Sequence, residues 1–335
     1  MEKQIKEKFN DEVLQEAMQR YGIADDQIRL LDGFESFIYE FERDHEAYIL
    51  RIGHSLRRTV PLIRGEVDWI NYLADRGASV TKAILSENGE LVEQIDDESG
   101  GHFLATAFAR AKGKPPGRAE WHASLFETYG QALGKMHALT KAYEPIEPTW
   151  KRPHWDDTIM LEVEKFLPAS EAIAIEGFHA LMQHLGTLPK DKETYGLIHQ
   201  DAHGGNFFVD ETGNITFFDF DDCAYSWFVN DMAIVLFYAV SWEWERDVPA
   251  FTREFMTHFL RGYRRENSID AAWLGEIPYF LKLREIDLYA VIHRSFDVNH
   301  LEHTWDIRFM RNRKYKIEHD VAYIDFDFES LAAHV

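Results

Sequence analysis

The periodicity of the hydrophobic residues changes near residue 110, and this change limits the folds that are open to the chain. Before it, short runs such as IRLLDGFESFIYEFE and HEAYILRIG are rich in Ile, Tyr and Phe and alternate as β-strands do. After it, long stretches with helical spacing dominate, from ASLFETYGQALGKMHALT to YFLKLREIDLYAVIHRSF. The 335 residues are too many for one simple core. We therefore predict an α+β chain with a small β-rich domain at residues 1–110 and a larger, mainly helical domain at residues 111–335.

Three local patterns give finer expectations. Apolar positions at helical spacing predict one amphipathic helix over residues 3–21, ended by Gly22. The stretch KAILSENGELVEQI is typical of a hairpin around Asn88-Gly89. Residues 159–185 form one of the long stretches for which we expect a helix.

Charge and cysteine content exclude several classes of protein. The formal net charge of −22 repels phosphate backbones and anionic membranes, so we expect neither as a partner. The densest basic run, RFMRNRKYK, is flanked by acidic segments and fits a solvated helix face or a helix end. The single cysteine, Cys223, excludes an intrachain disulfide and favours a reducing compartment. Since the N-terminus is charged and no window of about 18 residues is apolar, the sequence predicts a cytoplasmic protein.

The segment HQDAHGGNFFVDETGNITFFDFDD, residues 199–222, carries five aspartates around two short apolar runs. Asp201 and Asn206 flank a glycine pair, which permits a tight backbone path and lets both side chains converge. Asp219 ends the second apolar run, and a hairpin would return it to Asn206. Two carboxylates and a carboxamide at a strand edge form a hard-oxygen site that suits Mg²⁺.

Two other interpretations of this segment stand beside the metal site. The aspartates and the asparagine can be ordinary caps of an acidic turn. His199 and His203 have the spacing that places two zinc ligands on one helical face, as in a zinc hydrolase. The glycine pair opposes a helix there, and the sequence has no H-E-x-x-H pattern.

LIHQDAHGGNFF followed by ITFFDFDD resembles the catalytic segment of the aminoglycoside-phosphotransferase and choline-kinase-like family. The family pattern is H-x-D-x-x-x-x-N and then a strand that ends in aspartate. The matching residues are His199, Asp201, Asn206 and Asp219. A further family aspartate, twelve residues on, corresponds to Asp231. The resemblance spans roughly residues 28–240.

Upstream segments extend the resemblance. GFESFIYEF, with Gly33 and Ser36, lies where the family places the hairpin over the nucleotide, although its single glycine departs from a glycine-rich loop. Arg51 in YILRI stands where many kinases have a phosphate-pairing lysine, and Glu66 would be its partner on a helix. The alternative for both is a plain surface charge. FLATAFARAKG would be the hinge beside adenine. The long helix before the catalytic segment would contribute packing residues, namely Gly130, Gly134 and His137.

The resemblance implies a protein-kinase-like fold of two lobes, with ATP and Mg²⁺ in the cleft between them. Phosphoryl transfer then depends on positioning and on charge stabilisation. Asp201 would orient the acceptor hydroxyl and accept its proton. Asn206 and Asp219 would hold Mg²⁺. Arg51, steadied by Glu66, would bind the α- and β-phosphates.

The other polar residues of the segment would have supporting roles. His199 and Asp231 would brace the catalytic loop. Asp221 and Asp222 either add charge near the metal or cap the next turn.

The segment AVSWEWERDVPAF lies where the family builds its acceptor site. Trp242, Glu243 and Glu245 suit a cationic, partly apolar alcohol, or they cover a helix end. We therefore expect ATP-dependent phosphate transfer to a hydroxyl of a small molecule, such as an amino alcohol or an aminoglycoside-like compound. A bacterial stress-type Ser/Thr protein kinase shares the motif, but no A-P-E signature follows Asp219. A non-catalytic kinase-like binding protein is a further alternative, which the intact catalytic set opposes. The sequence leaves the oligomeric state open.

Overall fold

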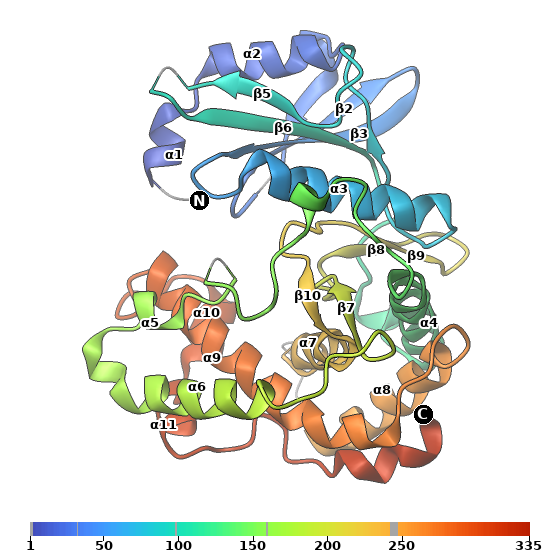
Figure 1. Cartoon of the computed structure of the whole chain (residues 1–335), viewed down its shortest axis with the longest axis vertical. Helices are drawn as coiled ribbons and strands as arrows, with labels where there is room; N and C mark the ends of the chain where they lie inside the picture. The colour runs from blue at the N-terminus through green and yellow to red at the C-terminus, as the bar shows by residue number, and fades with distance from the viewer. Residues whose placement is uncertain (1–2, 32, 98, 159, 242–246) are drawn as a thin grey trace.

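The computed structural model describes residues 3–31, 33–97, 99–158, 160–241 and 247–335, and it shows a β-rich part above a larger helical part (Figure 1). The β-rich part is an antiparallel sheet in the order β1-β2-β3-β6-β4, and β5 pairs with a further stretch of β6. Its strands are β1 (Ile28–Leu30), β2 (Phe37–Arg43), β3 (Glu46–His54), β4 (Ala83–Ile84), β5 (Glu93–Asp96) and β6 (His102–Ala109). The predicted α+β class is confirmed.

The predicted helix over residues 3–21 is instead two helices, α1 (Lys3–Lys8) and α2 (Asp11–Arg20). Asn10 is extended, at φ −140°, and its side chain accepts a hydrogen bond of 3.0 Å from the backbone N–H of Val13. It therefore caps α2 and ends the run before it. The single-helix prediction was wrong because it relied on hydrophobic spacing and passed over this cap. Apolar side chains of both helices join those of the sheet in one core.

The predicted hairpin around Asn88-Gly89 was wrong in its strand pairing. The turn itself forms, with Gly89 in the left-handed region at φ +80°. Both flanking strands pair with β6 instead, for example Ala83 of β4 opposite Phe108. Since β6 is eight residues long, the two short strands can use different stretches of it.

Within the predicted helical stretch 159–185, the described residues form two helices, α5 (Val163–Phe166) and α6 (Ala172–Leu185). Pro168 explains the break. A proline disfavours helical angles in the residue before it, and Leu167 is extended at ψ 127°.

The helical part encloses the larger hydrophobic core. α3 (Val60–Asp75) follows β3 and lies between the sheet and the helical part (Figure 1). The other helices are α4 (Ala123–Thr140), α7 (Phe228–Val240), α8 (Val248–Tyr263), α9 (Ile277–Ser295), α10 (Thr304–Met310) and α11 (Arg313–Glu318). Short 3₁₀ turns are η1 (Asp25–Gln27), η2 (Arg118–Glu120), η3 (Pro148–Trp150), η4 (Ala169–Glu171), η5 (Ala271–Glu276) and η6 (Phe328–His334). No helix of the described residues is long and apolar enough to cross a membrane.

α4 and α8 are in close backbone contact. A Cβ atom on Gly130 would lie 1.9 Å from the carbonyl oxygen of Phe259, and one on Gly134 would lie 2.6 Å from that of Tyr263. Both glycines are therefore packing residues, as predicted.

Two small antiparallel sheets carry the segment that the motif predicts to be catalytic. β7 (Tyr195–Ile198) pairs with β10 (Ala224–Trp227), and β8 (Phe207–Val209) pairs with β9 (Ile215–Phe217). The β8–β9 hairpin is the one expected from the sequence.

The basic run at 308–316 spans the end of α10 and the start of α11. Arg313 of this run is buried and pairs with Glu285 of α9. The prediction of a solvated helix face therefore holds for only part of the run.

Candidate active site

A cleft of about 730 Å³ lies between the sheet and the helical part. Its walls come from β2, β3 and the loop before β2, from the chain that follows β6, and from the β8–β9 region. The sequence-predicted site residues that line it are Gly33, Ser36, Arg51, Glu66, Asp201, Asn206 and Asp219. One cavity therefore gathers residues from widely separated parts of the chain.

One end of the cleft is apolar. Ile38 and Ile49 line it from the sheet, and Phe208 and Phe218 line it from the β8–β9 hairpin. The two phenylalanine rings are 4.9 Å apart in an edge-to-face arrangement. Residues 108–111, at the end of β6, complete this end. Such an apolar slot at the connection between the two parts suits the flat faces of a purine base.

The loop before β2 also lines the cleft and contacts the helical part. A Cβ atom on Gly33 would lie 2.3 Å from the carbonyl oxygen of Ser36, so this turn requires glycine. Glu35 lies 3.4 Å from Arg57 Nε and also pairs with Arg294 at the end of α9. These ion pairs connect the loop to both parts of the molecule.

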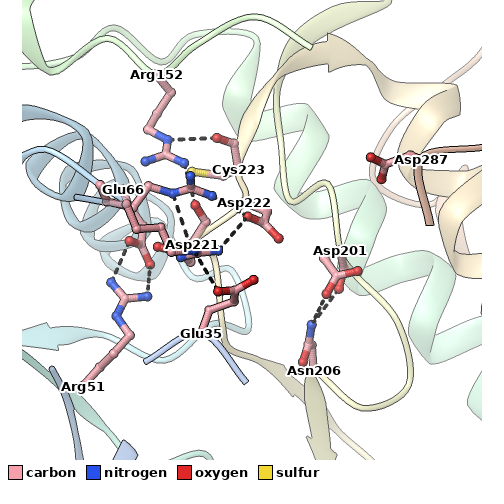
Figure 2. Close-up of polar contacts among 12 residues, drawn as sticks. Glu35, Arg51, Glu66, Arg152, Asp201, Asn206, Asp221, Asp222, Cys223 and Asp287 are labelled. Atoms are coloured by element: carbon pink, nitrogen blue, oxygen red, sulfur yellow. Dashed lines mark hydrogen bonds and ion pairs between the residues drawn. The ribbon is translucent and has the colours of Figure 1, made fainter. Parts of the chain in front are cut away.

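Arg51 and Glu66 form a buried two-pronged ion pair (Figure 2). Arg51 Nη1 and Nη2 donate to the two carboxylate oxygens of Glu66 at 2.8 and 2.7 Å. Arg51 is 7% exposed and Glu66 is fully buried, which rules out the surface-charge alternative. Although burial disfavours a charged guanidinium, Glu66 holds the pKa of Arg51 above its usual value. The pair places a fixed positive charge on the wall of the cleft.

Asp231, at the start of α7, organises the loop that carries Asp201. Its carboxylate accepts hydrogen bonds from the backbone N–H groups of His199 at 2.9 Å and Gln200 at 2.8 Å. Gln200 has φ +68°, a left-handed conformation that is costly for a side-chain-bearing residue and that these bonds help to hold. His137 Nε2 lies 3.1 Å from the same carboxylate. His137 was predicted as a packing residue only, and it also belongs to this buried polar network.

The ring of His199 is buried and forms a hydrogen bond to the backbone. Its Nε2 donates to the carbonyl oxygen of Phe218 at 3.1 Å, and burial lowers the pKa of the ring. The ring therefore supports the backbone after β9 rather than facing a metal. Among the described residues, no group of three or more His, Cys, Asp or Glu side chains is arranged to hold a metal, which removes support for the zinc alternative.

The Asp201 carboxylate has a defined partner at each oxygen. Asn206 Nδ2 donates to Asp201 Oδ2 at 2.9 Å (Figure 2), and Arg284 of α9 donates to Oδ1 at 2.6 Å. His203 Nε2 lies 3.4 Å from Oδ2. Although burial acts against the charged form, His203 and Arg284 lower the pKa of Asp201 to about 2. The carboxylate is therefore ionised and held in one orientation.

Asn206 and Asp219 are brought together by the hairpin, since the backbone N–H of Phe218 donates to the Asn206 carbonyl oxygen at 3.0 Å. The Asn206 amide nitrogen is used by Asp201, which leaves its side-chain oxygen as the atom for a cation. Desolvation, together with the nearby Asp221 and other carboxylates, raises the pKa of Asp219 to about 7. A divalent cation would offset this crowding, and Mg²⁺ needs few protein ligands. The residues present therefore fit such an ion.

Asp221 and Asp222 pair with two arginines that the sequence interpretation missed. Arg58 Nη2 lies 2.7 Å from Asp222 Oδ1, and Arg57 pairs with Asp221. Arg152 donates to the Cys223 carbonyl oxygen at 2.8 Å (Figure 2) and to the Asp221 carbonyl oxygen at 2.6 Å. Although burial acts against its charge, Arg57 and Arg58 hold the pKa of Asp221 well below its usual range. Through these pairs, the two aspartates connect the chain after β3 to the segment that follows β9.

The predicted acceptor residues Trp242, Glu243 and Glu245 lie outside the described residues. Among the described residues, α7 and α9 bring further polar groups to Asp201 through Arg284. Tyr238 OH accepts a hydrogen bond of 2.7 Å from Arg284 Nη2, and Asp287 Oδ2 lies 3.1 Å from Arg284 Nη1. The sequence interpretation did not single out these residues.

The two-part fold and this site define the class of kinase-like phosphotransferases: a buried arginine–glutamate pair and an Asp-Asn-Asp set face one cleft. Comparison with known proteins places the chain within that class. A family model described as "Phosphotransferase enzyme family" matches residues 26–267. The chain belongs to this family, and it is a kinase.

Individual relatives agree with the family assignment. The chain is 41% identical over 335 residues to amicoumacin kinase of Bacillus subtilis (strain 168), with 98% of each chain covered. It superimposes with a TM-score of 0.94 on amicoumacin kinase hAmiN in complex with AMP-PNP, Ca²⁺ and Ami, at 38% identity, covering 99% of this chain and 100% of that one. A microcompartment-associated aminopropanol kinase has the same fold, with a TM-score of 0.69, 22% identity and coverage of 97% and 95%.

Proposed function

We propose that this enzyme transfers the γ-phosphate of ATP, bound with Mg²⁺, to a hydroxyl group of amicoumacin or of a closely related small molecule. The observation that carries this proposal is the 41% identity with an amicoumacin kinase along 98% of both chains. The hAmiN complex with AMP-PNP and Ca²⁺ supports an ATP-type donor and a divalent cation.

Residues 1–110 would act as the nucleotide-binding lobe and residues 111–335 as the catalytic and acceptor lobe. The apolar slot would hold adenine. The loop with Gly33 and Ser36 would cover the phosphates. Arg51, fixed by Glu66, would bind the α- and β-phosphates through its remaining N–H groups. Since ATP is the donor, we propose the cytoplasm as the compartment.

Asn206 and Asp219 would hold Mg²⁺. When bound there, the ion neutralises charge on the transferred and leaving phosphate oxygens.

Asp201 would act as the base. The acceptor hydroxyl oxygen forms a bond to the γ-phosphorus while the bond from that phosphorus to the bridging oxygen breaks, and ADP leaves. The hydroxyl proton passes to the Asp201 carboxylate. The contacts of Asn206 and Arg284 with Asp201 support this role, since they fix its orientation.

Asp287 is a second carboxylate near Asp201, joined to it through Arg284. Desolvation, with Asp222 nearby, raises the pKa of Asp287 to about 6. A positively charged acceptor would relieve this desolvated charge, so we favour an amine-bearing alcohol. Trp242, Glu243 and Glu245 remain our proposal for further acceptor contacts.

The test is an ATP-consumption assay in saturating Mg²⁺ with amicoumacin, choline, an aminoglycoside and a generic protein as separate acceptors. We expect turnover with amicoumacin, and mass spectrometry should show the product to carry one added phosphate. Turnover with the protein alone would contradict the proposal and favour the protein-kinase alternative.

A further inference from the structure

Arg284 of α9 contacts the carboxylate to which the proposed mechanism gives the role of base. Its Nη2 donates to Asp201 Oδ1 at 2.6 Å, while Asn206 Nδ2 occupies Oδ2 at 2.9 Å. A carboxylate gripped at one oxygen can still turn about the bond to Cβ. Contacts at both oxygens fix the plane of the group and the direction of its free lone pairs.

Arg284 is itself held by two further groups. Its Nη2 also donates to Tyr238 OH at 2.7 Å, and its Nη1 donates to Asp287 Oδ2 at 3.1 Å. The guanidinium carbon lies 5.3 Å from the centre of the Tyr238 ring, and the side chain is 16% exposed. An arginine with this many contacts is pre-organised, so it can fix the position of the Asp201 carboxylate as well as supply positive charge.

Arg284 lies beyond the residues that the family model matches. The family model ends at residue 267, whereas α9 begins at Ile277 and packs against α7. The contact with Asp201 therefore comes from a segment beyond the residues that the family model matches.

We propose that Arg284 is a positioning residue for Asp201, so that α9 sets the orientation of the base toward the acceptor hydroxyl. This inference rests on the proposed role of Asp201. Two effects of Arg284 oppose each other, because its positive charge weakens Asp201 as a base while its contacts fix the direction of that base. Phosphoryl transfer asks little covalent work of the protein and depends mainly on alignment. The positioning effect therefore dominates, and loss of Arg284 lowers turnover.

The experiment compares R284M and R284K with the wild-type enzyme and with the control R313K. Arg313 makes a buried pair with Glu285, the residue next to Arg284 on α9, and it does not line the cleft. Each variant is assayed for phosphate transfer to amicoumacin, for acceptor-free hydrolysis of Mg·ATP, for Mg·ATP affinity and for Tm. In the hydrolysis reaction, water takes the place of the acceptor hydroxyl.

We expect R284M to lower kcat in both reactions by roughly 10²-fold, the size of effect that follows a small misplacement of a reacting group, with Mg·ATP affinity unchanged. R284K should recover part of that loss, since an ammonium can reach one oxygen but cannot reproduce the fork. R313K should lower Tm without lowering kcat. If the wild-type enzyme does not phosphorylate amicoumacin, the proposed acceptor fails, and the hydrolysis reaction still tests Arg284. The inference is overturned by an unchanged or higher kcat in R284M, or by an equal loss of kcat in R313K and R284K.

Discussion

Asp231→Asn removes the charge that holds the loop carrying Asp201, while it leaves the shape of the side chain almost unchanged. The wild-type carboxylate accepts backbone hydrogen bonds from His199 and Gln200 at 2.9 and 2.8 Å, and all three residues are buried or nearly so. An asparagine can accept only one of these bonds through its oxygen and turns an N–H group toward the other donor. Hydrogen bonds to charged groups contribute roughly 1.5–3 kcal/mol, and a buried donor without a partner costs about 1–3 kcal/mol. We therefore expect a loss of about 3 kcal/mol in the free energy of unfolding.

The corresponding change in Tm follows from the length of the chain. With an unfolding entropy of about 2.1 cal/mol/K per residue, the 335 residues give roughly 0.7 kcal/mol/K, so Tm should fall by about 4 °C. The loop would relax at Gln200, whose φ is +68°, and Asp201 would shift with it. We expect kcat to fall by about 10²-fold. Calorimetry and a coupled ADP-release assay measure the two effects.

A matched control separates stability from catalysis. Asp68 on α3 is also buried, and its Oδ2 accepts hydrogen bonds from Tyr143 OH at 2.7 Å and from the backbone N–H of Ile146 at 3.2 Å. It does not line the cleft. Asp68→Asn should lower Tm by less than Asp231→Asn does, since the asparagine oxygen can replace Oδ2 and keep both weakened bonds, and it should leave kcat intact. A normal kcat in Asp231→Asn, or an equal kcat loss in Asp68→Asn, would refute the reasoning.

Three further predictions test other parts of the site and fold. Arg51→Lys should weaken Mg·ATP binding because one ammonium cannot replace a guanidinium fork, and unchanged calorimetric affinity would count against a phosphate role. Asp201→Asn should lower turnover by about 10²-fold and keep its affinity for Mg·ATP, whereas Asp219→Asn should bind Mg·ATP more weakly. Calorimetric titration and steady-state kinetics of both variants measure the two effects. The opposite pattern would show that the assigned roles are wrong. Gly130→Ala should lower Tm, since its Cβ would lie 1.9 Å from a carbonyl oxygen, whereas the helical Gly177→Ala, with no atom within 4 Å, should raise stability by about 0.5–1 kcal/mol. Equal Tm changes in the two alanine variants would contradict the close packing of α4 on α8.

Local signals in the sequence correctly predicted the β8–β9 hairpin, whereas the predicted helices 3–21 and 159–185 ignored local signals that break them. The β8–β9 hairpin was predicted because its two apolar runs and its turn are adjacent in the chain. Asn10 and Pro168 end helices through their own side chains and ring, so these breaks were readable from local chemistry. The prediction from hydrophobic spacing alone merged the helices that those two residues separate.

The sequence by itself was sufficient to predict that Asp201, Asn206 and Asp219 come together, because they lie within one short segment that a hairpin folds back on itself. Arg51 and Glu66 could be matched only through the resemblance to a family, and the structure supplied their burial and their contact at 2.7–2.8 Å.

Only the tertiary structure decided which charges pair over long distances along the chain. Arg58 meets Asp222 across 164 positions, and Arg284 meets Asp201 across 83. The sequence offers many acidic and basic residues, and each has numerous possible partners of opposite charge. Coulomb attraction selects among them only after hydrophobic packing has fixed which elements face the cleft, because the interaction falls with distance and is screened in water.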